Sequence, residues 1–189
     1  AEGEWNAVSK SMTEIVRKFP LSPLQLSARY WIAESAYRTA RYDDAAAQLK
    51  TIHAQARGEQ VGWIGMIELR QAQILAHKKE WTNALTMAQQ ILRARPQFSR
   101  LYEVHYLVGR CLASRGEYRD ARSSYEKVIA TGKNTETAAL AQWMIGESYF
   151  HQKKYSDAIS AYRKVVAVYR FPRWKSAALL QTGKCLEVQ

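Results

Sequence analysis

The chain has 189 residues, of which 47% are hydrophobic and 24% are charged, so its composition is that of an ordinary folded domain rather than a disordered or collagen-like chain. Its 28 Lys and Arg residues outnumber its 17 Asp and Glu residues and give a net charge of +11. Two cysteines are too few for a disulfide-stapled miniprotein, and no apolar run approaches the roughly 20 residues that span a bilayer.

Internal repeats organise the chain. An aromatic residue stands three positions before an alanine in four places: Tyr42 and Ala45, Trp81 and Ala84, Tyr118 and Ala121, Tyr155 and Ala158. Successive alanines are 39, 37 and 37 residues apart. Twelve positions before each alanine there is another small residue, in the order Ala33, Ala72, Gly109 and Gly146, and Gly183 follows 37 residues later. Small residues at a fixed offset predict hairpins of closely approaching helices, so we expect Gly146 and Ala158 to face each other.

The residues after each alanine predict the second helix of each hairpin. Apolar or aromatic residues follow at four and seven positions, which is the spacing of one helix face: Leu49 and Ile52, Ala88 and Ile91, Tyr125 and Val128, Tyr162 and Val165. Short connections such as AHKKEW and SRGEY require neighbouring helices to run antiparallel. The repeat pattern therefore predicts an all-α chain of about ten helices.

In chain order, this layout begins with the second helix of an incomplete repeat within residues 1–22. Four helix hairpins follow, and a lone helix within residues 173–189 ends the chain. The hairpins are expected at 23–58, 59–96, 97–133 and 134–172. All of residues 1–189 then form a single array.

Two segments carry the signature of a known family. GESYFHQKKYSDAISAYRKVV and GRCLASRGEYRDARSSYEKVI have the Gly, Tyr or Leu, Ala, Tyr and aliphatic positions of tetratricopeptide repeats. The resemblance covers nearly the whole chain, and it implies a right-handed superhelical solenoid that binds other proteins. The chain departs from the usual pattern in its period of 37 rather than about 34 residues. It also lacks the Trp of the repeat's fourth position, where other residues stand: Arg29, Glu68, His105 and Gln142.

Some second helices extend to an aromatic–Pro pair, as in VRKFPLSP and VYRFPRW. In this they are similar to the arrays of bacterial envelope proteins such as the Tol-Pal coordinator and the outer-membrane assembly lipoprotein. That likeness implies the bacterial periplasm or envelope, and the cytoplasm is the alternative.

The sequence lacks the usual catalytic motifs, since it has no Gly-rich phosphate loop, His-Glu-x-x-His or Gly-x-Ser-x-Gly. His77 and His151 occupy equivalent positions at the ends of first helices, where the helix dipole favours His. Two repeats separate them by roughly 20 Å at about 10 Å per helix layer, which is too far for zinc ligands. The same spacing excludes a disulfide between Cys111 and Cys185, which we expect in the core. We therefore predict no enzymatic activity, no metal and no cofactor.

The basic excess suggests an alternative function, the binding of nucleic acid or an anionic surface. Half of the basic residues stand where helices are expected to end, however, and there the helix dipole stabilises a cation. They lie on two opposite rims and not along one track. The two sets are Arg38, Arg41, Lys78, Lys79, Arg115, Lys153 and Lys154, and Arg17, Lys18, Arg57, Arg93, Arg95, Lys133 and Arg170.

The first helix of each hairpin lines the concave wall in this fold, which predicts a groove for another protein or a peptide segment. The predicted groove residues are Tyr30, Glu34, Tyr37, Arg38, Leu69, Gln73, His77, Glu103, Tyr106, Arg110, Trp143, Glu147, Phe150, His151 and Lys184. Mixed charges and frequent aromatics suit a peptide better than a polyanion. Tyr30, Tyr106 and Trp143 have an alternative role, which is packing against the adjacent helix. The predicted function is a protein-binding scaffold, and self-association is a further possibility.

One known role of the family is excluded by the residues. Tetratricopeptide domains that bind the acidic C-terminus of eukaryotic chaperones use Lys and Asn at the fifth and ninth positions of one repeat, with further basic residues in the next two. Here those positions hold Tyr30 and Glu34, Leu69 and Gln73, or Tyr106 and Arg110. The clamp is missing.

Overall fold

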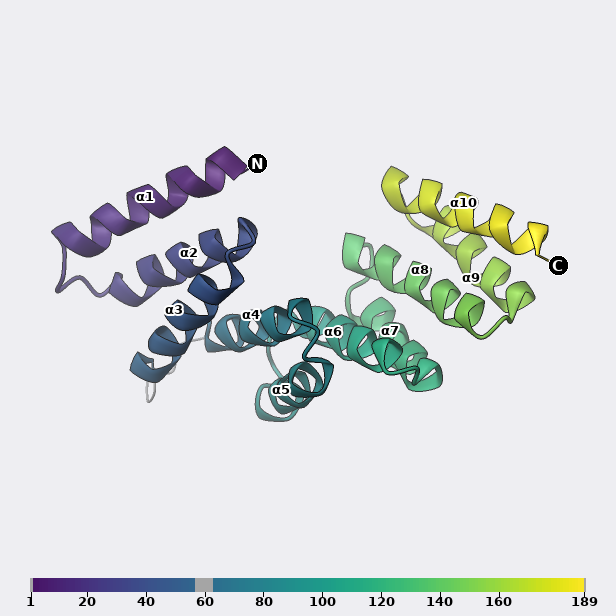
Figure 1. Cartoon of the computed structure of the whole chain (residues 1–189), viewed down its shortest axis with the longest axis horizontal. Helices are drawn as coiled ribbons and strands as arrows, with labels where there is room; N and C mark the ends of the chain where they lie inside the picture. Colours follow the sequence, from purple (N-terminus) through teal and green to yellow (C-terminus); the bar gives the residue numbers. More distant parts are fainter. Residues whose placement is uncertain (1, 57–62, 189) are drawn as a thin grey trace. The chain divides into compact units, whose positions relative to one another are not determined.

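A computed structural model of the chain describes residues 2–56 and 63–188. Those residues form ten α-helices and no strand (Figure 1), which confirms the predicted all-α fold. The helices are α1 (Glu2–Lys18), α2 (Gln25–Arg38), α3 (Tyr42–Gln55), α4 (Ile64–His77), α5 (Trp81–Ala94), α6 (Leu101–Ser114), α7 (Tyr118–Thr131), α8 (Glu136–His151), α9 (Tyr155–Val168) and α10 (Pro172–Glu187). Arg57 and the predicted hairpin boundary at 58–59 lie outside the described residues.

The helices belong to two compact units, Ala1–Lys78 and Lys79–Gln189. In the first unit, consecutive helices pack together from α1 to α4. In the second unit, consecutive helices pack together from α5 to α10, and α8 also contacts both α6 and α10 (Figure 1). The first helices α6, α8 and α10 therefore form one side of the second unit. No helix among the described residues is both long and apolar enough to cross a membrane.

The turns inside the hairpins share one backbone conformation. Ala40, Lys79, Gly116 and Lys153 all have positive φ, at 59°, 63°, 80° and 58°. After α2, the Arg41 amide donates to the Ala36 carbonyl at 2.8 Å, which is the long hydrogen bond of a Schellman motif. Equivalent bonds close α6 and α8 at 3.0 Å. Each first helix can therefore end within a short turn, although only Gly116 adopts the left-handed conformation without a Cβ penalty.

The small residues of the repeat lie under the side chains of the second helices. The Tyr125 ring lies 2.5 Å from the point where a Cβ on Gly109 would sit, and the Tyr162 ring crowds Gly146 in the same way. The three atoms nearest to an added Cβ at Gly146 all belong to Tyr162, one turn beyond Ala158, so the tyrosine ring limits the size of the residue at this position. The large tyrosine ring fits against the helix here because glycine has no side chain.

In unit 1, side chains of different size occupy the same two repeat positions. Ala33 takes the place of the glycine and Leu49 takes the place of the tyrosine, and both are fully buried. They belong to a core cluster that also contains Tyr30, Ile52 and Ile67. Unit 1 thus combines a larger small residue with a smaller large one than unit 2 does, as close packing of the hairpins requires.

Candidate partner-binding groove

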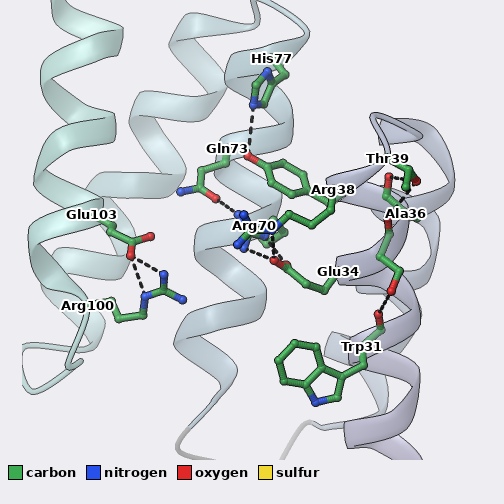
Figure 2. Close-up of polar contacts among 12 residues, drawn as sticks. Trp31, Glu34, Ala36, Arg38, Thr39, Arg70, Gln73, His77, Arg100 and Glu103 are labelled. Carbon is green, nitrogen blue, oxygen red and sulfur yellow. Dashed lines mark hydrogen bonds and ion pairs between the residues drawn. The ribbon is translucent and has the colours of Figure 1, made fainter. Parts of the chain in front are cut away.

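In unit 1, a buried ion pair joins Glu34 of α2 to Arg70 of α4 (Figure 2). Glu34 is only 3% exposed, and Arg70 donates to both of its carboxylate oxygens at 2.7 Å, from Nε to Oε2 and from Nη2 to Oε1. Arg38 adds a third bond, from Nε to Oε1 at 2.7 Å. The remaining donor Nη1 of Arg70 reaches the side-chain oxygen of Gln73 at 2.5 Å. This fork satisfies a charge that burial alone would make very costly.

Aromatic rings extend the same network. The Arg70 guanidinium carbon lies 4.0 Å from the centroid of the Tyr37 ring, and the Tyr37 hydroxyl is 3.1 Å from Nε2 of His77. His77 in turn stacks on Tyr42 with centroids 4.6 Å apart. Burial raises the pKa of Tyr37, and the nearby Arg70 charge opposes that rise. Five predicted groove residues therefore contact this internal network: Glu34, Tyr37, Arg38, Gln73 and His77.

Two more predicted groove residues of unit 1 lie in the core. Tyr30 is 6% exposed and Leu69 is 3% exposed. The Tyr30 ring packs beside Trp63 with centroids 5.9 Å apart. Of the two roles considered for Tyr30, the structure therefore shows packing against neighbouring helices. Tyr30, Leu69 and the buried Glu34 present almost no surface to a partner.

In unit 2, the corresponding side chains surround a pocket between α6 and α8, which we call the α6–α8 pocket. Its volume is about 320 Å³, and it is lined by Arg110, Ala113, Ser114, Tyr118, Trp143, Met144, Glu147, Ser148 and His151. Four of the predicted groove residues thus come together here: Arg110, Trp143, Glu147 and His151. Tyr118 and His151 form a stacked wall, with centroids 5.8 Å apart and planes 11° from parallel.

The two charged residues of the pocket differ in whether they have hydrogen-bond partners. Oε1 of Glu147 accepts bonds from the Tyr162 hydroxyl at 2.5 Å and from Nε2 of Gln181 at 2.8 Å. Arg110 has no hydrogen bond or ion pair with any residue that the structure describes, and its guanidinium carbon lies 6.0 Å from the centroid of the Trp81 ring. Burial raises the pKa of Tyr162, and donation to Glu147 raises it further. The pocket therefore offers an available cation, a carboxylate with one hydrogen-bonded oxygen and three aromatic surfaces.

The other predicted groove residues of unit 2 lie outside this pocket. Glu103 accepts from Nε of Arg100 at 2.8 Å. Phe150 packs edge-on against Tyr155 at 5.6 Å, and Lys184 is exposed on α10. Tyr106 is half-buried, with its centroid 6.0 Å from that of Tyr125.

Sequence reasoning missed Tyr118 as a pocket residue. Tyr118 begins a second helix, and its ring reaches the first helix of the next hairpin to stack on His151. A signal was present in the sequence, because Tyr42 and Tyr118 occupy one repeat position and His77 and His151 another. In the structure, Tyr42 likewise stacks on His77. Met144 and Ser148, which were also missed, stand between groove positions on α8.

In the described parts of the chain, no group of three or more His, Cys, Asp or Glu side chains is placed to hold a metal ion. Cys111 and Cys185 are free and buried. Burial raises the pKa of Cys111 to about 11, so its thiol is protonated at neutral pH.

Antiparallel helix hairpins that repeat with fixed small residues define a helical repeat protein. Residues 1–145 match the family profile of the tetratricopeptide repeat-like domain, and residues 140–170 match that of the tetratricopeptide repeat. The chain belongs to the tetratricopeptide repeat-like family. No protein with a curated description matches it.

Solved structures share this fold at low sequence identity. BtubC from P. vanneervenii superposes with a TM-score of 0.76 at 10% identity, covering 98% of this chain and 82% of BtubC. A thermophilic TPR protein from Thermus thermophilus gives 0.66 at 18% identity, with 97% and 91% coverage. PlcR from Bacillus thuringiensis, solved in complex with the peptide PapR7 and DNA, gives 0.71 at 18% identity, with 87% of this chain and 63% of PlcR covered. At these identities the likeness concerns the fold alone.

Proposed function

We propose that this chain is a non-catalytic scaffold that binds a segment of a partner protein in the α6–α8 pocket. The observation that carries the proposal is the half-buried Arg110, which lacks a polar partner among the described residues in a pocket walled by Tyr118, Trp143 and His151. Aromatic side chains and Arg dominate the binding energy of protein interfaces. A pocket that gathers them on rigid helices is suited to anchoring a peptide side chain.

The family supports this reading in a general way. Helical repeat arrays present extended inner surfaces to other proteins. PlcR, one of the structural relatives, was solved with a bound peptide as well as with DNA. The partner of this chain is then another protein or a peptide segment, and a second copy of the chain is one candidate.

Binding of nucleic acid through the basic rims is the alternative. Several rim residues are engaged with acidic neighbours, which reduces the charge available to phosphates. Lys78 contacts Asp43, Arg115 pairs with Glu117 at 2.7 Å, and Lys18 pairs with Glu14 at 3.4 Å. We therefore favour the protein-binding role.

A peptide selection tests the proposal. Random short peptides displayed on phage are selected against the chain, and the best binder is titrated against wild type, Trp143→Ala and Trp31→Ala. Trp31→Ala is the control because Trp31 is an exposed tryptophan of unit 1, at 42% exposure. We expect Trp143→Ala to weaken binding by about tenfold, the loss typical of an interface anchor, and Trp31→Ala to leave it unchanged.

A parallel titration with duplex and single-stranded nucleic acid at low and physiological salt tests the alternative. Tight binding that falls by orders of magnitude with salt and ignores Trp143→Ala would favour the basic rims, because released counterions make phosphate contacts salt-dependent.

The resemblance to envelope arrays stays a hypothesis. The structural relatives named above are neither Tol-Pal coordinators nor outer-membrane assembly lipoproteins. Fractionation of cells that express the natural gene product tests it, and recovery in the cytoplasmic fraction would contradict it.

A further inference from the structure

The loop between α1 and α2, residues Phe19–Leu24, exposes large apolar side chains (Figure 1). We call it the α1–α2 loop. Leu21 is 98% exposed, Leu24 is 64% exposed and Phe19 is 58% exposed. Single apolar residues are common on protein surfaces, but several together mark a contact with a protein or a membrane. Three in one loop of six residues therefore call for an explanation.

The backbone of this loop is held by its own hydrogen bonds. Residues 19–25 contain two prolines, which have no amide N–H, and five residues that have one. Four of these five amides donate: Phe19 to the Ile15 carbonyl at 3.0 Å, Ser22 to the Phe19 carbonyl at 3.0 Å, Leu24 to the Ser22 hydroxyl at 3.2 Å and Gln25 to the Ser22 carbonyl at 3.1 Å. The Gln25 side chain donates to the carbonyls of Val16 at 2.9 Å and Phe19 at 2.6 Å. Because unpaired backbone donors are costly in an apolar medium, this loop is suited to entering one.

Basic residues surround the apolar loop. Residues 19–28 contain no charged side chain, while Arg17 and Lys18 precede them and Arg29 follows. All three basic residues are exposed. Arg29 and Val16 line one cavity, which places Arg29 beside the C-terminal end of α1. Lys18 pairs with Glu14 at 3.4 Å, whereas Arg29 has no ion pair among the described residues. The α1–α2 loop is thus an uncharged tip on a basic support.

We propose that the α1–α2 loop binds the surface of an anionic lipid bilayer. Leu21, Leu24 and Phe19 enter the edge of the acyl-chain region, and the basic residues contact the headgroups. Peripheral binding of this kind combines apolar burial with attraction to anionic lipids. A bilayer fits better than a protein partner, because Leu21 contacts almost nothing else in the chain and so lines no groove. This surface belongs to unit 1, and the inference does not depend on the α6–α8 pocket of unit 2.

Sedimentation with vesicles tests the inference. The chain is mixed with vesicles of phosphatidylcholine and anionic phosphatidylglycerol, or of phosphatidylcholine alone. We expect it to bind the mixed vesicles at least about tenfold more tightly than the neutral ones. Leu21→Ser should weaken binding to the mixed vesicles by at least about tenfold, because one leucine side chain then no longer leaves water. The exposure of Leu21 means that this variant should fold and melt like the wild type.

Two further variants assign the binding to this loop. Leu179→Ser is the matched control, because Leu179 is an exposed leucine of unit 2, at 59% exposure, and its loss should leave vesicle binding unchanged. Arg29→Gln should weaken binding several-fold at low salt and less at high salt, since salt screens exposed charges. The loss caused by Leu21→Ser should persist at both salt concentrations, because apolar burial is not screened.

A dye on the loop reports whether it enters the bilayer. Leu24→Cys is labelled with a fluorophore whose emission shifts to the blue in an apolar environment. Cys111 and Cys185 are buried, so the exposed new thiol takes the label. We expect a blue shift with the mixed vesicles and none for Leu179→Cys labelled in the same way.

The outcomes are distinct from those for the proposed function. Absence of binding to the mixed vesicles, or binding that Leu21→Ser leaves unchanged, overturns the inference. A label that stays in water while the chain sediments also overturns it, since the basic residues alone then hold the chain. Self-association that Leu21→Ser abolishes, without vesicle binding, would show a second copy at the loop instead. The phage-selected peptide should bind Leu21→Ser as tightly as wild type, so either proposal can fail without the other.

Discussion

The two units place charged residues at the same repeat position, yet only one of them leaves a charge available. In unit 1, Glu34 follows the small residue of α2, and Arg70 from α4 covers it with two hydrogen bonds. In unit 2, Arg110 follows the small residue of α6, and no described carboxylate reaches it. The difference lies in the first helix of the following hairpin. In unit 1 that helix provides a side chain that pairs with the charge, whereas in unit 2 it does not and the charge stays available to a ligand.

The comparison also explains why the charged side chains are buried in unit 1, while Arg110 of unit 2 is only half-buried. The Glu34–Arg70 pair is nearly inaccessible to solvent, with side-chain exposures of 4% and 8%. A carboxylate and a guanidinium in a forked arrangement can be buried together, since each satisfies the other. Arg110 has no such partner and stays half-buried beside a pocket of about 320 Å³. We expect the Glu34–Arg70 pair of unit 1 to support stability and the α6–α8 pocket of unit 2 to support binding.

The largest expected effect is on the stability of unit 1. Replacing Arg70 by Met leaves the Glu34 carboxylate buried without its main partner, which should lower the free energy of unfolding by about 3–5 kcal/mol. Urea denaturation followed by circular dichroism measures the loss. Lys18→Met is the control, since Lys18 belongs to an exposed pair with Glu14 and should change stability by less than about 1 kcal/mol. Equal effects of the two substitutions would contradict the role given to the buried pair.

The two buried tyrosines of unit 2 should respond with opposite signs. Tyr162→Phe removes a hydrogen bond to a charged acceptor and should cost about 1.5–3 kcal/mol. Tyr125→Phe removes a hydroxyl that has no partner among the described residues, so stability should stay constant or rise by up to about 1 kcal/mol. Thermal melts of both variants check this. A loss of similar size for Tyr125→Phe would show that its hydroxyl already has an acceptor.

The glycines of unit 2 should tolerate a methyl group only where no ring covers them. Gly146→Ala forces the Tyr162 ring aside and should cost about 1–3 kcal/mol. Gly183→Ala is the matched control, because nothing lies within 4 Å of its added Cβ and alanine favours the helix by up to about 1 kcal/mol. The double change Gly146→Ala with Tyr162→Leu restores the sizes found at Ala33 and Leu49 in unit 1. Because Tyr162→Leu alone also removes the hydrogen bond to Glu147, the double change is compared with the two single changes, and it should cost less than their sum. Additive losses would argue against size complementarity.

The smallest effect concerns the turns. Lys153 has a φ of 58°, a conformation that costs an L-residue about 1–2 kcal/mol. Lys153→Gly should therefore raise stability by up to about 1 kcal/mol after the added chain entropy is subtracted, and Gly116→Ala should lower it by a similar amount. Differential scanning calorimetry resolves both shifts. Shifts of the same sign would contradict the shared turn conformation.

The sequence predicted the helices well because their pattern is local and periodic. Helical spacing after each alanine and the short connections were enough to predict about ten helices and to place His77 and His151 at the ends of α4 and α8. The first-helix register also selected four residues that line the α6–α8 pocket. These features depend on neighbours within one repeat.

Contacts between repeats were not predicted, because they depend on side-chain length and direction rather than on period. Arg70 stands off the expected groove register, yet its long side chain reaches Glu34 and occupies the wall of unit 1. Tyr118 reaches the next hairpin in the same way. The unsatisfied hydroxyl of Tyr125 became apparent only when its surroundings were compared with those of Tyr162.

The six tryptophans provide the most direct test of the central claim, which is that unit 2 rather than unit 1 binds the partner. Three of them lie in each unit: Trp5, Trp31 and Trp63 in the first, and Trp81, Trp143 and Trp174 in the second. With ¹⁵N-labelled tryptophan, each indole N–H gives its own signal in a titration with the phage-selected peptide. We predict that the signals of Trp143, in the pocket wall, and Trp81, beside Arg110, shift while those of unit 1 stay in place. Shifts confined to the tryptophans of unit 1 would contradict the account.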